Sequence, residues 1–224
     1  MTAIPHRWEL TPAEAIRLQR ELASRVDRST PLDLEALRLV AGVDVSVKAG
    51  ISRAAIVVLR FPELVPVETV RAEMPTPFPY IPGLLSFREG AVILAAHAKL
   101  TCQPDAYLCD GQGIAHPRRL GIASHIGLWL DAPSVGCAKS RLIGVFSTLA
   151  QEKNACQPLM DGGEVIGMAL RTRAGVKPVY VSIGHRATLE TAVELVLGCV
   201  TRYRLPEPTR AAHHAAGRVV ERIG

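Results

Sequence analysis

Three apolar runs rich in β-branched residues follow one another with only short turns between them. They are LVAGVDVSV (39–47), RAAIVVLRF (53–61) and LVPVETVRAEM (64–74). Runs of this kind predict strands, and strands joined by short turns pair in antiparallel fashion. The sequence therefore predicts an antiparallel three-stranded meander, and the rest of the chain must be added to it. Pro66 predicts an exposed or irregular edge on the third strand.

Helical and strand patterns then alternate along the chain. Helices are predicted at 12–27, 87–100, 121–130, 188–200 and after Pro208, and strands at 105–109, 133–139, 164–172 and 177–183. The last two strands read as a hairpin around Ala174-Gly175. No repeat, low-complexity tract or long linker divides the sequence. We therefore expect one α/β domain over residues 1–224, with a mixed sheet flanked by helices.

Composition limits the compartment and the partners. The 224 residues suffice for a full core, and with 48% apolar but only 4% aromatic residues that core must be aliphatic. The N-terminus lacks the order of a signal peptide, and no stretch reaches the roughly 18 apolar residues of a membrane span. The five cysteines show no metal-knuckle spacing. We expect a cytoplasmic monomer without a membrane partner. A net charge of +5 fits a polyanionic partner or an incidental basic surface.

Two aspartates occupy positions where a core disfavours charge. Asp44 lies between valines in the first predicted strand, where an unpaired carboxylate is costly. It either accepts backbone hydrogen bonds or binds a cation. Asp110 ends the strand at 105–109 and precedes Gly-Gln-Gly. That position is either an ordinary Asp-Gly turn or a ligand site at the carboxyl end of a strand.

Glu89 has two competing interpretations. The segment Ser86-Phe-Arg-Glu89 has the spacing of a capping box, in which Glu89 would bond the Ser86 amide. Glu89 also shares a helical face with Val92, Ile93 and Ala96, which would turn it toward the core. The sequence leaves the choice open.

Together, the three carboxylates predict a cation site. Oxygen ligands without a Cys/His cluster of zinc spacing favour Mg²⁺ or Mn²⁺. Such a cluster suits in-line hydrolysis of a phosphodiester. Lys139, at the end of the strand at 133–139, would add a positive charge for the phosphate or the attacking water.

The segment PTPFPYIPGLLSFREG (75–90) is an unusually stiff loop. Its prolines fix φ and restrain the residues before them, so Tyr80 and Ile81 have little entropy left to lose. A rigid tip of this kind can enter the space of a displaced base and stack on its neighbours. The alternative is a proline-rich guard for the edge of the sheet.

These motifs resemble the endonuclease V family, nucleases that act on deoxyinosine in DNA. The resemblance covers roughly residues 40 to 215, and its blocks lie in family order. The matching blocks are Gly42-Val-Asp44-Val-Ser46, Pro79-Tyr-Ile-Pro-Gly83, Leu85-Ser-Phe-Arg-Glu89, Asp110-Gly-Gln-Gly through His125, Gly136-Cys-Ala-Lys139-Ser and Leu205-Pro-Glu-Pro-Thr-Arg210. Val47 departs from the pattern, because the family commonly has an aromatic residue there.

The resemblance implies a ribonuclease-H-like fold and assigns roles to residues of this sequence. The metal-binding and catalytic carboxylates would be Asp44, Glu89 and Asp110, the catalytic lysine Lys139 and the catalytic histidine His213, with His214 beside it as a competitor. The DNA wedge would be Tyr80, Ile81 and Pro82, and the base pocket Gly83, Leu85, Gly111 and Gly113. We expect His116, Arg118 and Arg119 to contact phosphates, the alternative being a solvated loop.

The expected activity is that of a Mg²⁺-dependent DNA repair endonuclease, with Mn²⁺ able to substitute. It would recognise deoxyinosine and hydrolyse the second phosphodiester bond on its 3′ side, leaving 3′-hydroxyl and 5′-phosphate ends. Three alternatives remain: an inosine-specific endoribonuclease, a non-cleaving inosine-binding module, and another ribonuclease-H-like nuclease such as a hybrid or junction enzyme. The carboxylates argue against a module that only binds inosine, and the Tyr-Ile wedge argues against the third.

Overall fold

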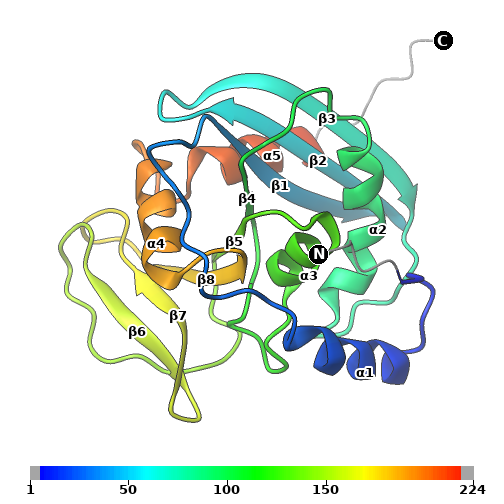
Figure 1. Ribbon diagram of the computed structural model, residues 1–224, viewed down its shortest axis with the longest axis horizontal. Coiled ribbons are helices and arrows are strands. Elements are labelled where there is room, and N and C mark those ends of the chain that lie inside the picture. The colour runs from blue at the N-terminus through cyan, green and yellow to red at the C-terminus, as the bar shows by residue number, and fades with distance from the viewer. Residues whose placement is uncertain (1–5, 218–224) are drawn as a thin grey trace.

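The computed structural model describes residues 6–217, which form an eight-stranded mixed sheet flanked by helices (Figure 1). The strand order is β3-β2-β1-β4-β5-β8-β7-β6. The strands are β1 (Leu39–Lys48), β2 (Ile51–Arg60), β3 (Val65–Pro75), β4 (Ala106–Cys109), β5 (Ser134–Ala138), β6 (Cys156–Asp161), β7 (Glu164–Leu170) and β8 (Val179–His185). The helices are α1 (Pro12–Ala23), α2 (Leu85–His97), α3 (Ile122–Leu130), α4 (Leu189–Gly198) and α5 (Glu207–Gly217).

The predicted meander is confirmed. β1 pairs with β2 and β2 with β3, both antiparallel, while β4 and β5 continue the sheet in parallel from β1. β3 forms one edge of the sheet. Its register shifts where Val58 pairs with Glu68 and Leu59 with Pro66, so the irregularity expected at Pro66 is present. A proline that lacks an N–H fits this edge position.

β6 was not predicted, because CQPLMD is short, only partly apolar and interrupted by Pro158. The strand is stable as the opposite edge of the sheet, where a missing donor costs little. A signal for it was present in the sequence. Gly162 and Gly163 have φ values of 59° and 85°, as a tight hairpin turn requires, and Gly-Gly is a recognised hairpin signal. The hairpin predicted from 164–172 and 177–183 is confirmed as β7 and β8.

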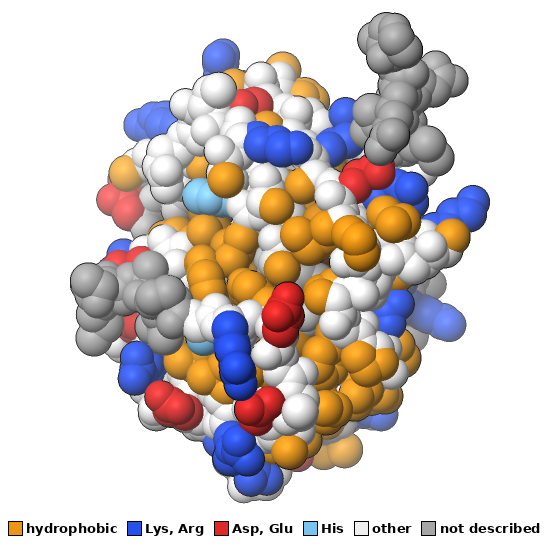
Figure 2. All heavy atoms as spheres, turned by 90° about the vertical axis from the view of Figure 1, so that its right-hand side faces the viewer, with side chains coloured by type: hydrophobic (Ala, Val, Ile, Leu, Met, Phe, Trp, Pro, Cys, Tyr) orange, Lys and Arg blue, Asp and Glu red, His pale blue; other side chains and the backbone are white. Residues whose placement is uncertain are grey.

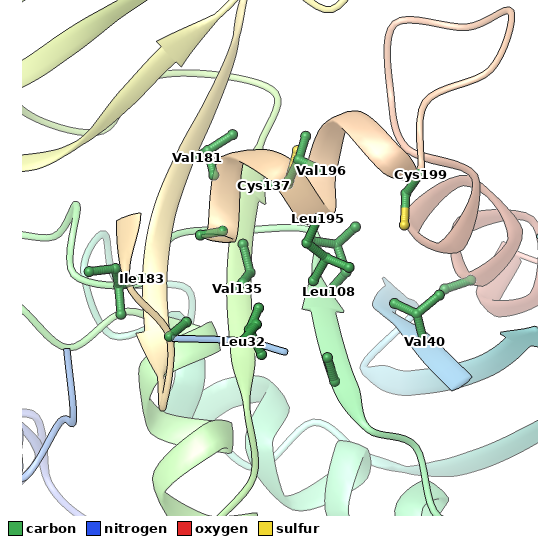
Figure 3. Close-up of a cluster of buried hydrophobic side chains, with 14 of the residues drawn as sticks. Leu32, Val40, Leu108, Val135, Cys137, Val181, Ile183, Leu195, Val196 and Cys199 are labelled. Atoms are coloured by element: carbon green, nitrogen blue, oxygen red, sulfur yellow. The ribbon is translucent and has the colours of Figure 1, made fainter. Parts of the chain in front are cut away.

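Alternate residues of the central strands build two cores on opposite faces of the sheet. On β2, Ala55, Val57 and Leu59 pack toward α4 and α5, whereas Ile56 and Val58 pack toward α2 and α3. This alternation follows from the two-residue period of a strand. Figure 3 shows the first core, in which Leu195 and Val196 lie over Leu108 and Val135. The helices therefore approach the central strands from both sides.

Charged side chains are dispersed over the surface. On the face shown in Figure 2, apolar side chains occupy the middle, and Lys and Arg side chains are scattered around them rather than gathered in one block. The net positive charge therefore defines no binding face by itself on this side. Within residues 6–217, no helix has the length and apolar character needed to cross a membrane.

α5 lies directly against β1, and a glycine permits this contact. A Cβ atom built at Gly42 would lie 1.9 Å from the carbonyl oxygen of Pro208, in the first turn of α5. Gly42 and Asp44 project from the same face of β1, since they are two residues apart. The absence of a side chain at residue 42 therefore decides how closely α5 approaches the strand that carries Asp44.

We predict that Gly42→Ala destabilises the protein by about 2 kcal/mol or more, because the new methyl group meets backbone rather than a movable side chain. Lys48→Ala, at the exposed end of the same strand, should leave stability nearly unchanged. Equilibrium denaturation by urea measures both variants. Equal midpoints for Gly42→Ala and the wild type would contradict this account of the α5 contact.

Candidate active site

Asp44 and Asp110 are neighbours because β4 ends beside the middle of β1. The last paired residues of the two strands are Val43 and Cys109, and the amide of Asp110 donates to the carbonyl of Val43 at 3.1 Å. Asp44 is therefore inside its own strand, yet it lies beyond the end of the β1–β4 pairing. This explains how a carboxylate can occupy an otherwise apolar strand.

Each aspartate contacts a basic side chain from another element. The Nδ1 atom of His213, on α5, lies 2.9 Å from an oxygen of Asp44. The ammonium group of Lys139, just after β5, lies 2.5 Å from an oxygen of Asp110. Ligand atoms of Asp44, Asp110 and His213 all lie within 4.8 Å of one another. The structure thus brings four of the five predicted catalytic residues into two adjoining pairs.

Glu89, the fifth, reaches the same region from α2 and is not a helix cap. The cap position is Leu84, which makes no side-chain cap bond, and the hydroxyl of Ser86 is 2.9 Å from Nδ1 of His125. The inward-facing interpretation of Glu89 is therefore the observed one. Burial and the nearby Asp44 raise the pKa of Glu89 to about 8. Among residues 6–217, however, the one group of ligand atoms close enough to share an ion does not include Glu89.

The carboxyl groups disfavour one another's ionisation in this partly buried site. Burial, followed by the charge of Asp110, also raises the pKa of Asp44, although the hydrogen bond from His213 opposes the shift. Like charges in a partly buried site disfavour ionisation unless a cation is present. Carboxylate oxygens with one imidazole form a donor set that suits Mg²⁺ or Mn²⁺. The residues present therefore fit a hard divalent cation.

The predicted wedge has an exposed tip, and the loop residues on either side of it are buried. Tyr80 is 70% exposed, whereas Phe78 and Leu84 on either side are buried with Ala15 of α1. The guanidinium of Arg88 lies 5.8 Å from the centre of the Tyr80 ring. The loop therefore presents its aromatic ring to solvent while both ends are fixed in a small apolar cluster.

A cavity of about 320 Å³ lies between the wedge and Asp110. Three of the four predicted pocket residues, Gly83, Leu85 and Gly111, line it together with Asp110 and Lys139. Tyr80, Ile81, Pro82 and His116, predicted for other roles, also line the cavity. The lining residues to which the sequence gave no role are Gln19, Ser86, Gln112, Leu120, Gly121, Ile122, Ala138, Ser140, Arg141 and Leu142. Several follow Asp110 in the signature already quoted, so their proximity was readable from the sequence.

Gly113, the fourth predicted pocket residue, does not line this cavity. A Cβ atom at Gly113 would lie 1.9 Å from the carbonyl of Ile183, and its amide donates to the hydroxyl of Ser182. Gly113 therefore permits a close approach of the loop to β8 behind the pocket. Gly111, by contrast, both lines the cavity and packs against Ile122.

The predicted phosphate-contacting residues are bonded within the protein. His116 is buried, and its Nε2 atom lies 2.9 Å from the carbonyl of Gly83. Arg118 also donates to that carbonyl, and Arg119 forms ion pairs with Asp161 and Glu164. The segment is therefore not the freely solvated loop considered above. Contact of these side chains with phosphate stays a prediction.

Arg204 is a supporting residue that sequence reasoning missed. Its guanidinium donates to the carbonyls of Lys139 at 2.6 Å and Pro178 at 2.8 Å. It lies immediately before the Leu205–Arg210 motif, which was the available signal. Arg204 therefore ties the backbone that carries Lys139 to the segment leading into α5.

A mixed sheet with acidic side chains converging where β1 and β4 separate defines a ribonuclease-H-like protein with a nuclease-type site. The sequence profile of the family described as Endonuclease V matches residues 20–214. The chain therefore belongs to the endonuclease V family.

Similar proteins cover nearly the whole chain. The endonuclease V of Nostoc sp. is 55% identical over 214 residues, covering 95% of this chain and 96% of its own, and that of Dehalococcoides mccartyi is 51% identical over 217 residues, covering 96% of both. The crystal structure of endonuclease V from Streptomyces avermitilis superposes with a TM-score of 0.90 at 40% identity, covering 95% of this chain and 94% of its own. The enzyme of Ciona intestinalis, solved with a 24mer DNA containing an inosine followed by a ribo-adenosine, gives a TM-score of 0.77 at 29% identity, covering 91% and 95%.

The two adjacent histidines of α5 provide a matched test. Both side chains are exposed, but His213 contacts Asp44, and the ring of His214 lies 6.2 Å, centre to centre, from that of His213. We predict that His213→Ala lowers the single-turnover rate of strand cleavage at inosine by about a hundredfold or more. His214→Ala should change that rate by less than about threefold. The reverse order would show that His214 acts in the reaction.

Proposed function

We propose that this chain is a divalent-metal-dependent endonuclease that recognises deoxyinosine in DNA and nicks the same strand. The cut falls at the second phosphodiester bond on the 3′ side and leaves 3′-hydroxyl and 5′-phosphate ends. A single catalytic domain over residues 1–224 carries the whole activity. The observation that carries the proposal is an acidic cluster beside a cavity whose rim bears a stiff, exposed tyrosine. The inosine-containing DNA bound by the Ciona relative supports it.

Tyr80, Ile81 and Pro82 act first, by filling the space that a displaced base leaves in the duplex. Extrusion of a base costs a few kcal/mol of stacking and pairing. A wedge that is already rigid loses little entropy on insertion, so more of its stacking energy offsets that cost. The 70% exposure of Tyr80 leaves its ring available for this contact.

The displaced hypoxanthine occupies the cavity lined by Gly83, Leu85 and Gly111. Hypoxanthine has a carbonyl where adenine has an amine, and it carries a proton on N1. The pocket must therefore donate to O6 and accept from N1–H, which backbone groups can do. Leu85 supplies an apolar contact, and the absence of a side chain at Gly111 lets the base approach the backbone.

Asp44 and Asp110 would hold a divalent cation, with Glu89 beside them and His213 within reach of the same position. When bound, Mg²⁺ or Mn²⁺ supplies positive charge that polarises the scissile phosphate and the attacking water. Lys139 places its ammonium group next to Asp110, where it attracts the phosphate and opposes its negative charge. Asp44 orients the imidazole of His213, which can accept or return a proton. His116, Arg118 and Arg119 contact phosphates of the bound DNA strand next to the site.

The test is a single-turnover assay on end-labelled DNA with one inosine, with Mg²⁺ in the buffer. We predict a nick one nucleotide beyond the inosine for the wild type. Asp110→Ala should lower the rate at least about a thousandfold, because it removes a carboxylate of the cation site. Glu194→Ala, which removes an exposed carboxylate on α4, should cut at the wild-type rate. Chelation of the metal should abolish cutting, and added Mg²⁺ or Mn²⁺ should restore it.

A parallel RNA substrate separates the remaining alternatives. Cutting of inosine-containing RNA but not DNA would support the proposed active site, but it would change the proposed substrate from DNA to RNA. Tight binding of inosine without cutting in either metal would overturn the nuclease proposal and leave a protein that only binds the base. Cutting that does not depend on inosine would indicate a different ribonuclease-H-like nuclease.

A further inference from the structure

One carbonyl at the base of the wedge accepts three hydrogen bonds. The oxygen of Gly83 lies 2.9 Å from Nε2 of Gln19, 2.9 Å from Nε2 of His116 and 2.7 Å from an Nη atom of Arg118. A carbonyl oxygen has two lone pairs, so three donors exceed its usual number of partners. Gln19 belongs to α1, whereas His116 and Arg118 belong to the segment after β4. Two distant parts of the chain therefore converge on a single backbone atom.

Gln19 is the buried centre of this arrangement. It lies on the inner face of α1 between Ala15 and Leu22, and it is only 1% exposed. Its Nε2 atom donates to the carbonyls of Gly83 and Leu120, and its Oε1 atom accepts from Nε of Arg118 at 2.5 Å. The side-chain amide of Gln19 is thus bonded at both of its polar atoms. A buried glutamine in an apolar stripe needs such partners to offset its desolvation.

The protonation of His116 fits the same arrangement. Its Nδ1 atom accepts from the amide of Arg118 at 3.1 Å, so the proton resides on Nε2 and is donated to Gly83. Burial, followed by the nearby charge of Arg118, lowers the pKa of His116 to about 4. The ring is therefore neutral at physiological pH, and the geometry assigns its tautomer.

Gly83 connects the wedge to the pocket. Its φ of 79° is left-handed, and a Cβ atom there would lie 2.8 Å from an Nη atom of Arg118. Tyr80, Ile81 and Pro82 precede it, and Leu85 of the cavity follows two residues later. The prolines limit the internal freedom of the loop, but they do not fix where the loop sits on the protein. The bonds to Gly83 supply that second constraint.

We propose that Gln19 is a positioning residue for the wedge. Gln19 holds the Gly83 carbonyl, so that Tyr80 stays inserted in the duplex although the neighbouring bases tend to restack. The inference rests on the proposed function, since it concerns the opening of a duplex at inosine. It adds a residue of α1 to those that serve recognition of the base. It also gives His116 and Arg118 a structural role, which is to hydrogen-bond the Gly83 carbonyl. Gln19 acts through Gly83 and does not itself take part in the reaction.

The first arm of the test measures the loop in the protein alone. In Gln19→Met, hydrogen exchange of a peptide that covers residues 80–87 should quicken about tenfold or more, because the loop loses a tether. Leu22→Ala is the matched control, since Leu22 is buried on the same helix but packs in another core. It should destabilise α1 without selective exchange at the wedge. Equal exchange rates in Gln19→Met and the wild type would overturn the proposal that Gln19 restrains the wedge loop.

The second arm compares inosine in a duplex with inosine in a single strand, because a wedge matters where bases must be unstacked. For Gln19→Met, the duplex rate should fall about tenfold relative to the single-strand rate. Leu22→Ala should keep the wild-type ratio, since a general loss of stability affects both substrates alike. An unchanged ratio in Gln19→Met would overturn the positioning role.

Two further controls keep the test decisive. If Gln19→Met does not fold, Arg118→Met removes two other bonds of the anchor from a half-buried position, and it should give the same selective exchange and the same fall in ratio. Unchanged behaviour of Arg118→Met would then overturn the proposal. Failure of the wild type to cut either substrate is a different result, because it would overturn the proposed function and with it the wedge role of Gln19.

Discussion

The pairing of β1 with β4 places two carboxylates where neither can be fully solvated. Because β4 ends at Cys109 opposite Val43, Asp110 leaves the sheet beside Asp44. Their mutual repulsion and their burial must be offset, and the surrounding elements do this with His213 and Lys139. Glu89 adds a third acidic group whose pKa is raised to about 8. The site therefore favours the binding of positive charge, as the proposed metal-dependent hydrolysis of a phosphodiester requires.

Helices on both faces of the sheet complete this site. α2 contributes Glu89 from one face, and α5 contributes His213 from the other. The approach of α5 depends on Gly42, because any side chain there would collide with the backbone at Pro208. A glycine two residues before Asp44 therefore affects the site although it has no side chain. It fixes the distance over which the histidine must reach.

The proposed recognition of inosine depends on rigidity that the loop gains in two different ways. The prolines of the 75–82 segment reduce the number of conformations that the wedge can adopt. The three donors on Gly83 fix the position of that segment against α1 and the loop after β4. A rigid loop without the bonds to Gly83 would be displaced as a whole when the bases restack. A loop with those bonds but without the prolines would lose conformational entropy on insertion. The Gln19 anchor and the prolines are complementary for this reason.

The sequence alone determined the β-meander, the five helices of the described residues, the acidic residues and the proline-stiffened loop, because these depend on local periodicity and on residue chemistry. It also placed the chain in its family, since the signature blocks are contiguous. It missed β6, whose edge position tolerates a pattern too polar for a buried strand. It could not choose between the two roles of Glu89 or between His213 and His214, because each choice depends on which side chain a distant element meets.

Tertiary structure also moved Gly113 behind the pocket and turned His116 and Arg118 toward Gly83. Gln19 was visible in the sequence only as a polar residue in an apolar stripe, and its three partners lie 64, 99 and 101 residues away along the chain. Local sequence thus determined which groups were available. The fold decided which of them met, because contacts between distant segments form only when packing brings them within hydrogen-bonding distance.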